Sequence, residues 1–496
     1  MRELPTGWVN CSLGDVVDYG KTVKAVMGEI NSETWVLELE DIEKDSSKIL
    51  QRVSFGERQP KSSKNAFTAG DVLYGKLRPY LNKMIVAPED GICTSEIVPL
   101  SPPVGLLDNL YLFYWLKGRI FGHYVNAVSY GVNMPRLGTK DGLIAPMVLA
   151  PLAEQKRIVE KLDEVLAQVD TIKARLDSIP AILKCFRQSV LASAVSGKLT
   201  EEWRSINKVE NAVDELATCF NKKSGKLKLR GKQANFSELK LLSLPKSWTW
   251  AANYKLAKDE SNAICAGPFG TIFKAKDFRE EGVPIIFLRH VKEIGFNQNK
   301  PNFMDIEVWR DLHQEYSVHG GELLVTKLGD PPGECCIYPD NAGIAMVTPD
   351  VLKMDVDENA VLKKYLRAYF NSPISTEIID KLAFGVTRLR IDIAMFKGFP
   401  IPLPSMNEQK EIVRLVDNYF ELADTIEVQV KKAQMRVDNL TQSILAKAFR
   451  GELVPQDPND EPADKLLERI AQSRIESEAL AKAAKKATSS KKSSAK

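Results

Sequence analysis

The sequence predicts an α+β protein in which two similar mixed α/β domains are joined by two long antiparallel coiled-coil helices, with a pseudo-two-fold relation between the halves. Two observations predict this fold: a long helical pattern occurs twice, and the globular segment before each helix also occurs twice. The chain has 496 residues, too many for one hydrophobic core, so several domains are expected. Its 44% hydrophobic and 27% charged residues are typical of a soluble globular protein.

The repeated helical pattern covers residues 152–195 and 406–449, where apolar residues recur at alternating steps of four and three. This spacing places the apolar side chains along one stripe of a helix, as in the a/d seam of a coiled coil. The predicted seam residues are Ile158, Leu162, Val169, Ile172, Leu176 and Leu183 in the first helix and Ile412, Val416, Ile426, Val430, Val437 and Leu440 in the second.

The ends of the two helices match as well. Glu154 and Glu408 stand at the same place near the two starts, and Gly197 and Gly451 suit the left-handed position that follows a helix. Pro180 lies inside the first helix, where it removes a backbone hydrogen bond and clashes with the preceding turn. Because the apolar spacing continues across Pro180, we expect a kink rather than a break.

The globular segments also repeat. Residues 1–150 and 241–404 consist of short apolar runs between Gly, Pro, Asn and Asp residues, which is the pattern of strands and turns. Residues 4–8 (LPTGW) are echoed by residues 244–248 (LPKSW). The predicted boundaries are 1–150 and 241–404 for the globular domains, 151–200 and 405–455 for the spacer helices, 201–240 for a connector, and 456–496 for a lysine-rich tail that we expect to be disordered.

The order of these segments predicts how the helices pair. The first helix leads the chain from the first domain to the second, and the second helix has to lead back, so the two are antiparallel. About 44 residues at roughly 1.5 Å each make a helix of about 66 Å. A rigid spacer of that kind predicts a protein that recognises two similar objects at a fixed distance from each other.

Composition and motifs exclude several classes. No apolar run reaches the roughly 18 residues of a membrane span, and the N-terminus does not have the pattern of a signal peptide. The seven cysteines form no Cys-x-x-Cys pair, which indicates a reducing, cytoplasmic location. We find no P-loop, no zinc-protease motif and no metal-ligand cluster, so no cofactor is expected in this chain. The net charge of +3 means that any nucleic-acid surface is a local patch.

Residues 330–333 (Asp-Pro-Pro-Gly) invite comparison with an adenine methyltransferase motif. Enzymes that act on an extruded base stack it on an aromatic or apolar side chain. Gly333 supplies no ring at the position where that motif has an aromatic residue, and no glycine-rich cofactor loop follows a strand. We therefore expect a turn here.

The helix starts at 150–159 and 404–413, and the helix ends at 188–199 and 442–453, resemble the specificity (S) subunit of type I restriction–modification systems. The resemblance runs from Leu4 to Asn459. It implies two target-recognition domains that each read one half of a bipartite double-stranded DNA site. It also implies that the paired helices hold two methylation (M) subunits, which restriction (R) subunits join. S-adenosylmethionine, ATP and Mg are then expected on these partner subunits, and this chain is expected to be a non-catalytic subunit.

Basic residues at matched places are candidates for DNA contacts, since cations bind phosphates and arginine reads guanine edges. Two turns carry them after the matching runs 70–77 and 321–328, and two loops carry them just before the spacer helices. The candidates are Lys76, Arg78, Arg136, Arg289, Lys327, Arg388 and Arg390. For each of them, solvated surface charge is the alternative interpretation.

Two other functions stay open at this point. The chain could be a solitary DNA methyltransferase or nuclease that keeps its active site in one half, although the missing motifs disfavour this. It could also be a scaffold that spaces two protein partners without reading DNA. Binding of S-adenosylmethionine by the isolated chain would favour the first, and a complex without DNA sequence preference would favour the second.

Overall fold

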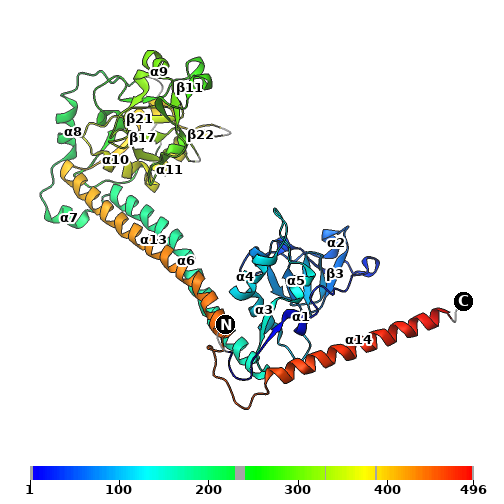
Figure 1. The fold of residues 1–496 in the computed structure, drawn as a ribbon. Coiled ribbons are helices and arrows are strands. Elements are labelled where there is room, and N and C mark those ends of the chain that lie inside the picture. The colour runs from blue at the N-terminus through cyan, green and yellow to red at the C-terminus, as the bar shows by residue number, and fades with distance from the viewer. Residues whose placement is uncertain (1–3, 230–238, 240, 330, 386–387, 494–496) are drawn as a thin grey trace. The chain divides into compact units, whose positions relative to one another are not determined.

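The computed structural model describes residues 4–229, 239, 241–329, 331–385 and 388–493 (Figure 1). The chain divides into two compact units. Unit 1 comprises residues 1–177 and 431–496, and unit 2 comprises residues 178–430. Each unit therefore contains one globular domain together with part of each long helix.

The two long helices form where the apolar repeat predicts them. Helix α6 runs from Leu152 to Val195, and helix α13 runs from Met406 to Ala448. Pro180 lies inside α6 without ending it, so the predicted helix is continuous. No described helix is long and apolar enough to cross a membrane.

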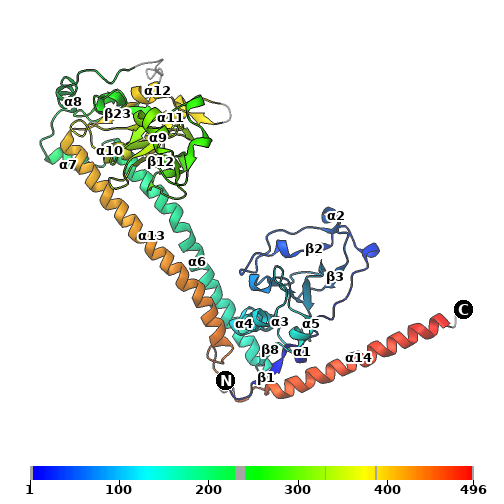
Figure 2. The same ribbon diagram turned by 45° about the horizontal axis from the view of Figure 1, so that its top comes forward.

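Within unit 1, the first part of α6 pairs with the last part of α13, as both views show (Figure 1, Figure 2). Lys173 Nζ lies 2.8 Å from Asp438 Oδ1, and Gln434 Nε2 donates to Asp177 Oδ1 at 2.7 Å. Moving four residues forward along α6 thus means moving four residues back along α13. The helices are antiparallel here, as predicted.

Within unit 2 the same antiparallel pairing joins the later part of α6 to the first part of α13. Arg187 Nη2 lies 2.6 Å from Asp424 Oδ1 and 3.2 Å from Glu427 Oε2. The rings of Phe186 and Tyr419 meet edge to face with centroids 6.1 Å apart.

The predicted seam is buried near the globular domains but not along the whole length of the helices. The seam residues that are buried are Ile158, Leu162, Val169, Leu183, Ile412, Val416 and Val430. Leu176 and Val437 are half-buried, whereas Ile172, Ile426 and Leu440 are exposed. The expectation of a continuous buried seam is therefore not met at these last three positions. Ile158, Leu162 and Val169 belong to the core of unit 1, and Ile412 and Val416 belong to the core of unit 2. Leu183 and Val430 are buried outside these cores, so buried and exposed positions alternate along the helix pair.

The globular part of unit 1 is built on three small sheets and on three helices that lie between β7 and β8 in the chain. Two short helices, α1 (Leu13–Val16) and α2 (Phe55–Arg58), lie among the strands. The strands are β1 (Val9–Ser12) with β8 (Pro146–Leu149), β5 (Met84–Val86) with β4 (Val72–Gly75) and β7 (Ile97–Leu100), and β2 (Trp35–Leu37) with β6 (Gly91–Thr94) and β3 (Lys64–Phe67). The helices are α3 (Asn109–Lys117), α4 (Arg119–Val128) and α5 (Thr139–Leu143).

Unit 2 has larger sheets. One has the order β10 (Ile264–Ala266), β21 (Val351–Met354), β17 (Leu323–Thr326) and β19 (Cys335–Ile337). Another has the order β11 (Phe278–Arg279), β15 (Asn302–Met304), β12 (Val283–Ile286), β20 (Ala345–Val347) and β16 (Ser317–Val318). The two-stranded pairs are β9 (Thr249–Ala252) with β23 (Pro400–Leu403), β13 (Val291–Lys292) with β14 (Gly295–Phe296), and β18 (Leu328–Gly329) with β22 (Leu389–Arg390).

The helices of unit 2 come from the connector and from the second globular domain. The connector contributes α7 (Glu201–Ile206) and α8 (Ala212–Phe220), and the domain contributes α9 (Ile306–Leu312), α10 (Lys363–Phe370), α11 (Pro373–Leu382) and α12 (Ile393–Gly398).

The two globular domains share their central topology. In unit 1, β4 lies between β5 and β7, and in unit 2, β17 lies between β19 and β21, with all four pairings antiparallel. Two helices and one shorter helix then lead to a strand that pairs antiparallel with the first strand of the domain, β8 with β1 and β23 with β9. The second sheet is repeated too, because β6 pairs parallel with β2 and antiparallel with β3, as β20 does with β12 and β16. The predicted internal repeat is therefore present in the fold, and unit 2 enlarges this sheet from three strands to five.

One equivalent hydrogen bond anchors each domain to its long helix. Trp8 Nε1 donates to Glu154 Oε2 at 2.9 Å in unit 1, and Trp248 Nε1 donates to Glu408 Oε2 at 2.9 Å in unit 2. Both carboxylates are buried, so each needs such a donor. This explains why the sequence repeats a tryptophan in the LPxxW segments and a glutamate at the helix starts.

The C-terminal tail differs from the expectation of disorder. Helix α14 runs from Ala463 to Ser493. Its first turns carry Ala463, Leu466 and Ile470, which are buried in the core of unit 1, and Arg474 donates to Asp18. These apolar residues at helical spacing give the tail a packed surface that its overall composition conceals.

Candidate nucleic-acid interface

In unit 1 the turn after β4 crosses the loop before α5. The amide of Leu137 donates to the carbonyl oxygen of Lys76 at 3.0 Å, and the amide of Arg78 donates to that of Pro135 at 2.7 Å. These bonds place Arg136 beside the two basic residues of the turn. We call residues 76–78 and 130–137 the unit 1 crossing.

In unit 2 the equivalent segments cross in the same way. Strand β18 pairs antiparallel with β22, and the amide of Ile391 donates to the carbonyl oxygen of Lys327 at 3.0 Å. Arg390 thereby lies opposite Leu328, next to Lys327. We call residues 327–329 and 384–391 the unit 2 crossing; residues 386–387 lie outside the described part of the chain.

The structure thus brings together most of the basic residues predicted from sequence. Lys76, Arg78 and Arg136 meet in the unit 1 crossing, and Lys327, Arg388 and Arg390 belong to the unit 2 crossing. Arg289 lies on a different segment, between β12 and β13. Its guanidinium donates to the Lys300 carbonyl oxygen at 3.0 Å and to Asn302 Oδ1 at 2.6 Å. Contact of any of these residues with DNA stays a prediction.

A carboxylate holds the arginine of the unit 1 crossing. Arg136 Nε lies 3.1 Å from Glu96 Oε2, and its Nη2 lies 3.4 Å from Glu96 Oε1. Both side chains are partly exposed, and such pairs contribute roughly 0–1 kcal/mol to stability. A pair this weak exchanges readily for a DNA phosphate or a guanine edge.

The backbone of Arg78 is unusual. Its φ of +48° lies in the left-handed region, which is uncommon for residues other than glycine. The hydrogen bond from its amide to Pro135 holds it there. Backbone strain of this kind concentrates at functional sites, so Arg78 is a stronger candidate than its sequence position alone suggests.

Aromatic rings hold the cations of the unit 2 crossing. Lys327 Nζ lies 4.2 Å from the centre of the Phe269 ring, and the Arg390 guanidinium carbon lies 4.9 Å from that of Phe384. Cation–π contacts of this kind are worth about 0.5–1 kcal/mol at exposed sites. Burial lowers the pKa of Lys327 below its usual value. Among the described residues, no carboxylate pairs with Arg390. The unit 2 crossing therefore presents Arg390 next to Lys327, whose side chain is partly buried.

An open cleft of about 480 Å³ borders the unit 1 crossing, and Leu77 and Glu96 form part of its lining. Its wall also carries the pair of Lys64 and Glu38, with Nζ 2.6 Å from Oε1. Lysine and arginine donate to guanine, and carboxylates accept from the amino group of cytosine. The cleft thus offers both kinds of partner for base edges next to the crossing.

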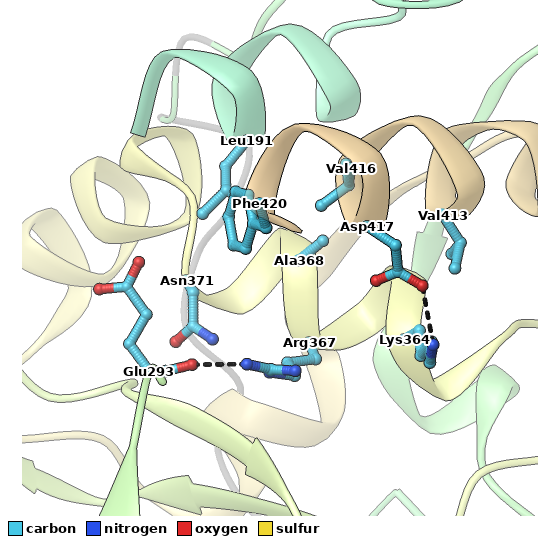
Figure 3. A pocket seen from close by; sticks show the side chains of 10 residues that line it. All are labelled: Leu191, Glu293, Lys364, Arg367, Ala368, Asn371, Val413, Val416, Asp417 and Phe420. Atoms are coloured by element: carbon cyan, nitrogen blue, oxygen red, sulfur yellow. Dashed lines mark hydrogen bonds and ion pairs between the residues drawn. The ribbon is translucent and has the colours of Figure 1, made fainter. Parts of the chain in front are cut away.

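A second cavity, shown in Figure 3, lies in unit 2 where α10 packs against α13. It measures about 40 Å³, which holds only a few water molecules. Lys364 Nζ lies 2.8 Å from Asp417 Oδ2, and Arg367 Nη2 donates to the backbone oxygen of Glu293 at 2.8 Å. These contacts seat the second domain on its own part of the helices, so the cavity is a packing feature and not a cofactor site.

The described residues contain no group of three or more His, Cys, Asp or Glu side chains that could hold a metal ion. In the segment 330–333, Asp330 lies outside the described residues. The amide of Gly333 donates to the carbonyl oxygen of Thr326 at 2.9 Å and to its Oγ1 at 3.0 Å, which closes a turn between β18 and β19.

Sequence reasoning missed the groups that hold the cations. Glu96 is 40 residues from Arg136, and no local pattern joins them. Phe269 lies in the turn 267–270, and its meeting with Lys327 depends on the tertiary fold. One signal was available: an aromatic residue precedes a glycine at the same offset in both halves, as Tyr130-Gly131 and Phe384-Gly385.

Comparison with known proteins bears on this arrangement. Residues 351–433 match the family model described as the type I restriction modification DNA specificity domain. The chain is 30% identical over 376 residues to the EcoBI specificity subunit of Escherichia coli, which covers 76% of this chain and 72% of the relative. It is 31% identical over 368 residues to the EcoKI specificity subunit of E. coli strain K12, covering 71% and 68%.

Solved structures show the same fold. A chain from a study of complex assembly and conformational transition of the type I R-M system superposes with a TM-score of 0.64 at 18% identity, covering 91% of this chain and all of that one. The HsdS subunit from Thermoanaerobacter tengcongensis gives a TM-score of 0.53 at 17% identity, covering 91% and 98%. The prediction of a non-catalytic recognition subunit agrees with the names of these relatives. This chain belongs to the specificity subunits of type I restriction–modification systems.

Proposed function

We propose that this chain reads a bipartite double-stranded DNA target, with one unit on each half-site, and that its paired helices hold two methylation subunits. The observation that carries the proposal is the duplicated crossing. Two segments far apart in each unit meet through matching backbone hydrogen bonds, Leu137 to Lys76 and Ile391 to Lys327, and place cations together. A scaffold that never met DNA would have no need of this arrangement twice.

The two crossings combine the two kinds of contact that DNA recognition needs. Cations fix the protein on the phosphates, and side chains that reach base edges provide sequence specificity. Lys76 and Lys327 are the phosphate partners in this proposal, whereas Arg136, Arg388 and Arg390 are the candidates for guanine. The half-sites differ because the side chains around these cations differ.

The exposed apolar side chains of the long helices support the second part of the proposal. Several apolar side chains of these helices are exposed, and exposed apolar surface of this kind marks contacts with partner proteins. They are Ile172, Met435 and Leu440 in unit 1 and Ile182, Tyr419, Leu422, Ile426 and Val428 in unit 2. Each unit offers its own set, which fits one methylation subunit on each unit and restriction subunits that join them. S-adenosylmethionine, ATP and Mg belong to those partners in this proposal.

Native mass spectrometry tests whether the paired helices hold two methylation subunits. The expected mass of the complex is that of one chain and two methylation subunits. Ile172→Glu places a charge in the unit 1 set and removes one partner, and Leu422→Glu does the same for unit 2. Ala174→Glu, which adds the same charge at an exposed position on the opposite side of α6 from Ile172, is the control and keeps both partners. A wild-type complex with a single partner would contradict the proposal.

A further inference from the structure

A short hairpin projects from the unit 1 crossing. Tyr130 and Arg136 exchange two backbone hydrogen bonds, from the Tyr130 amide at 3.2 Å and from the Arg136 amide at 2.9 Å. Gly131 has φ +109°, and a Cβ at this position would lie 3.0 Å from the Met134 carbonyl oxygen. The turn therefore has a fixed, tight shape that requires glycine. We call residues 130–136 the unit 1 finger.

The tip of this finger is apolar and exposed. Tyr130 is 63% exposed, Val132 101% and Met134 45%, so these side chains add little to any core. Single exposed apolar residues are common on protein surfaces, but three on one tight turn form a patch that indicates a binding surface.

Cations surround the base of the finger. Lys76 and Arg78 lie on the segment that the finger crosses, and Arg136 closes it. A finger with an apolar tip and positively charged residues where it joins the domain fits a DNA duplex. The phosphates attract the cations, and the major groove displays the methyl groups of thymine. The groove is also wide enough to admit a two-stranded ribbon such as this hairpin.

We propose that the unit 1 finger enters the major groove and that Val132 and Met134 contact the 5-methyl groups of thymines, so that the half-site read by unit 1 contains thymine beneath the finger. This inference rests on the proposed function and assigns a base to one half-site. It applies to unit 1 only. In unit 2 the counterpart of Tyr130 is Phe384, whose ring faces the guanidinium of Arg390.

The test replaces thymine by deoxyuridine, which lacks only the methyl group. The full complex with methylation subunits is titrated with duplexes of its mapped target, in which each thymine of the unit 1 half-site is replaced in turn. The wild-type complex loses about fourfold in affinity at one or two positions, the factor expected for one methyl-sized group. Val132→Ser or Met134→Ser loses a similar factor on the thymine duplex and nothing further on the matching deoxyuridine duplex.

Two controls isolate the contact. Val104→Ser changes a valine of unit 1 that is 99% exposed but lies outside the finger, and this variant keeps the full sensitivity to deoxyuridine. Deoxyuridine in the other half-site affects the wild-type complex and the finger variants equally. Because Val104, Val132 and Met134 are all exposed, the substitutions should leave folding intact, and circular dichroism checks this.

Two outcomes overturn the inference. Deoxyuridine has no effect on the wild-type complex at any thymine of the unit 1 half-site, or the finger variants lose the same additional factor on deoxyuridine as the wild type. The last outcome would mean that the tip contacts something other than the methyl group. A complex without any DNA sequence preference would instead refute the proposed function itself.

Discussion

The two crossings share a backbone but hold their cations differently. In unit 1 Arg136 rests on the Glu96 carboxylate, whereas in unit 2 Lys327 and Arg390 rest on the rings of Phe269 and Phe384. A carboxylate competes with DNA for an arginine, but an aromatic ring can stay in place while the cation binds a phosphate. The difference shows how one duplicated scaffold can present two chemically distinct surfaces. Under the proposed function, these surfaces read two different half-sites.

Exchanging one globular domain gives the largest expected effect. Replacing residues 1–150 by the equivalent domain of a relative should replace one half-site completely and leave the other unchanged, because each crossing is built within its own unit. Sequencing of methylated adenines in cells that carry the chimera and its partners measures this. A change in both half-sites, or in neither, would break the comparison between independent units.

Shortening both helices should change the spacing and not the half-sites. Deleting Arg175–Ala181 together with Val430–Arg436 removes one heptad from each helix, about 10 Å or three base pairs of rise. Deleting from both helices keeps the antiparallel pairs on either side in register. The unread gap in the target should contract by about three base pairs. An unchanged gap in an active variant would mean that the helices serve only for docking.

Removing one arginine at a time should affect one half-site at a time. Arg390→Ala and Arg136→Ala each lose roughly tenfold or more in specific binding if the side chain reads a guanine, since a good bidentate contact is worth about 1–3 kcal/mol. Base substitutions at the affected half-site then have less effect than in the wild type. Arg52→Ala serves as the control, because Arg52 is a half-exposed arginine of unit 1 that pairs with Glu89 outside both crossings.

The tryptophan anchors should be equivalent in stability. Trp8→Phe and Trp248→Phe each leave a buried carboxylate oxygen without its indole donor, which costs about 1–3 kcal/mol. Each variant should lower the melting temperature by a similar amount. The carboxylates are not in identical surroundings, because the other oxygen of Glu408 accepts from Thr200 at 2.7 Å and from Arg204, whereas that of Glu154 accepts from Gln456 at 3.2 Å. A clearly smaller loss for Trp248→Phe would show how much the stronger donors at Glu408 compensate.

The smallest effect is expected at Glu96. Glu96→Gln removes the charge that holds Arg136 and should raise DNA affinity by a few-fold, the reverse of the usual result for a lost ion pair, because the pair itself contributes only roughly 0–1 kcal/mol. Among the described residues of unit 2, no carboxylate pairs with Arg390 as Glu96 does with Arg136, so only contacts in the unit 1 half-site should strengthen. A loss of affinity instead would indicate that Glu96 itself contacts a base.

Sequence predicted the parts of this protein that depend on local periodicity. The apolar steps of four and three located α6 and α13. The repeated LPxxW segments and the matching runs 70–77 and 321–328 located equivalent strands, such as β4 and β17. Prediction was weaker where burial depends on neighbours, as at Ile172 and Leu440, which are exposed. It missed Glu96, Phe269 and the finger tip, since these meet their neighbours only after folding. Composition also concealed the packed face of α14.

The central claim is that one chain carries two separate recognition surfaces. Mapping methylated adenines across the genome of a host that expresses this chain with its methylation subunits tests it most directly. The account predicts one motif made of two specified half-sites separated by several unspecified base pairs. A continuous motif without a gap, or methylation without sequence preference, would contradict it.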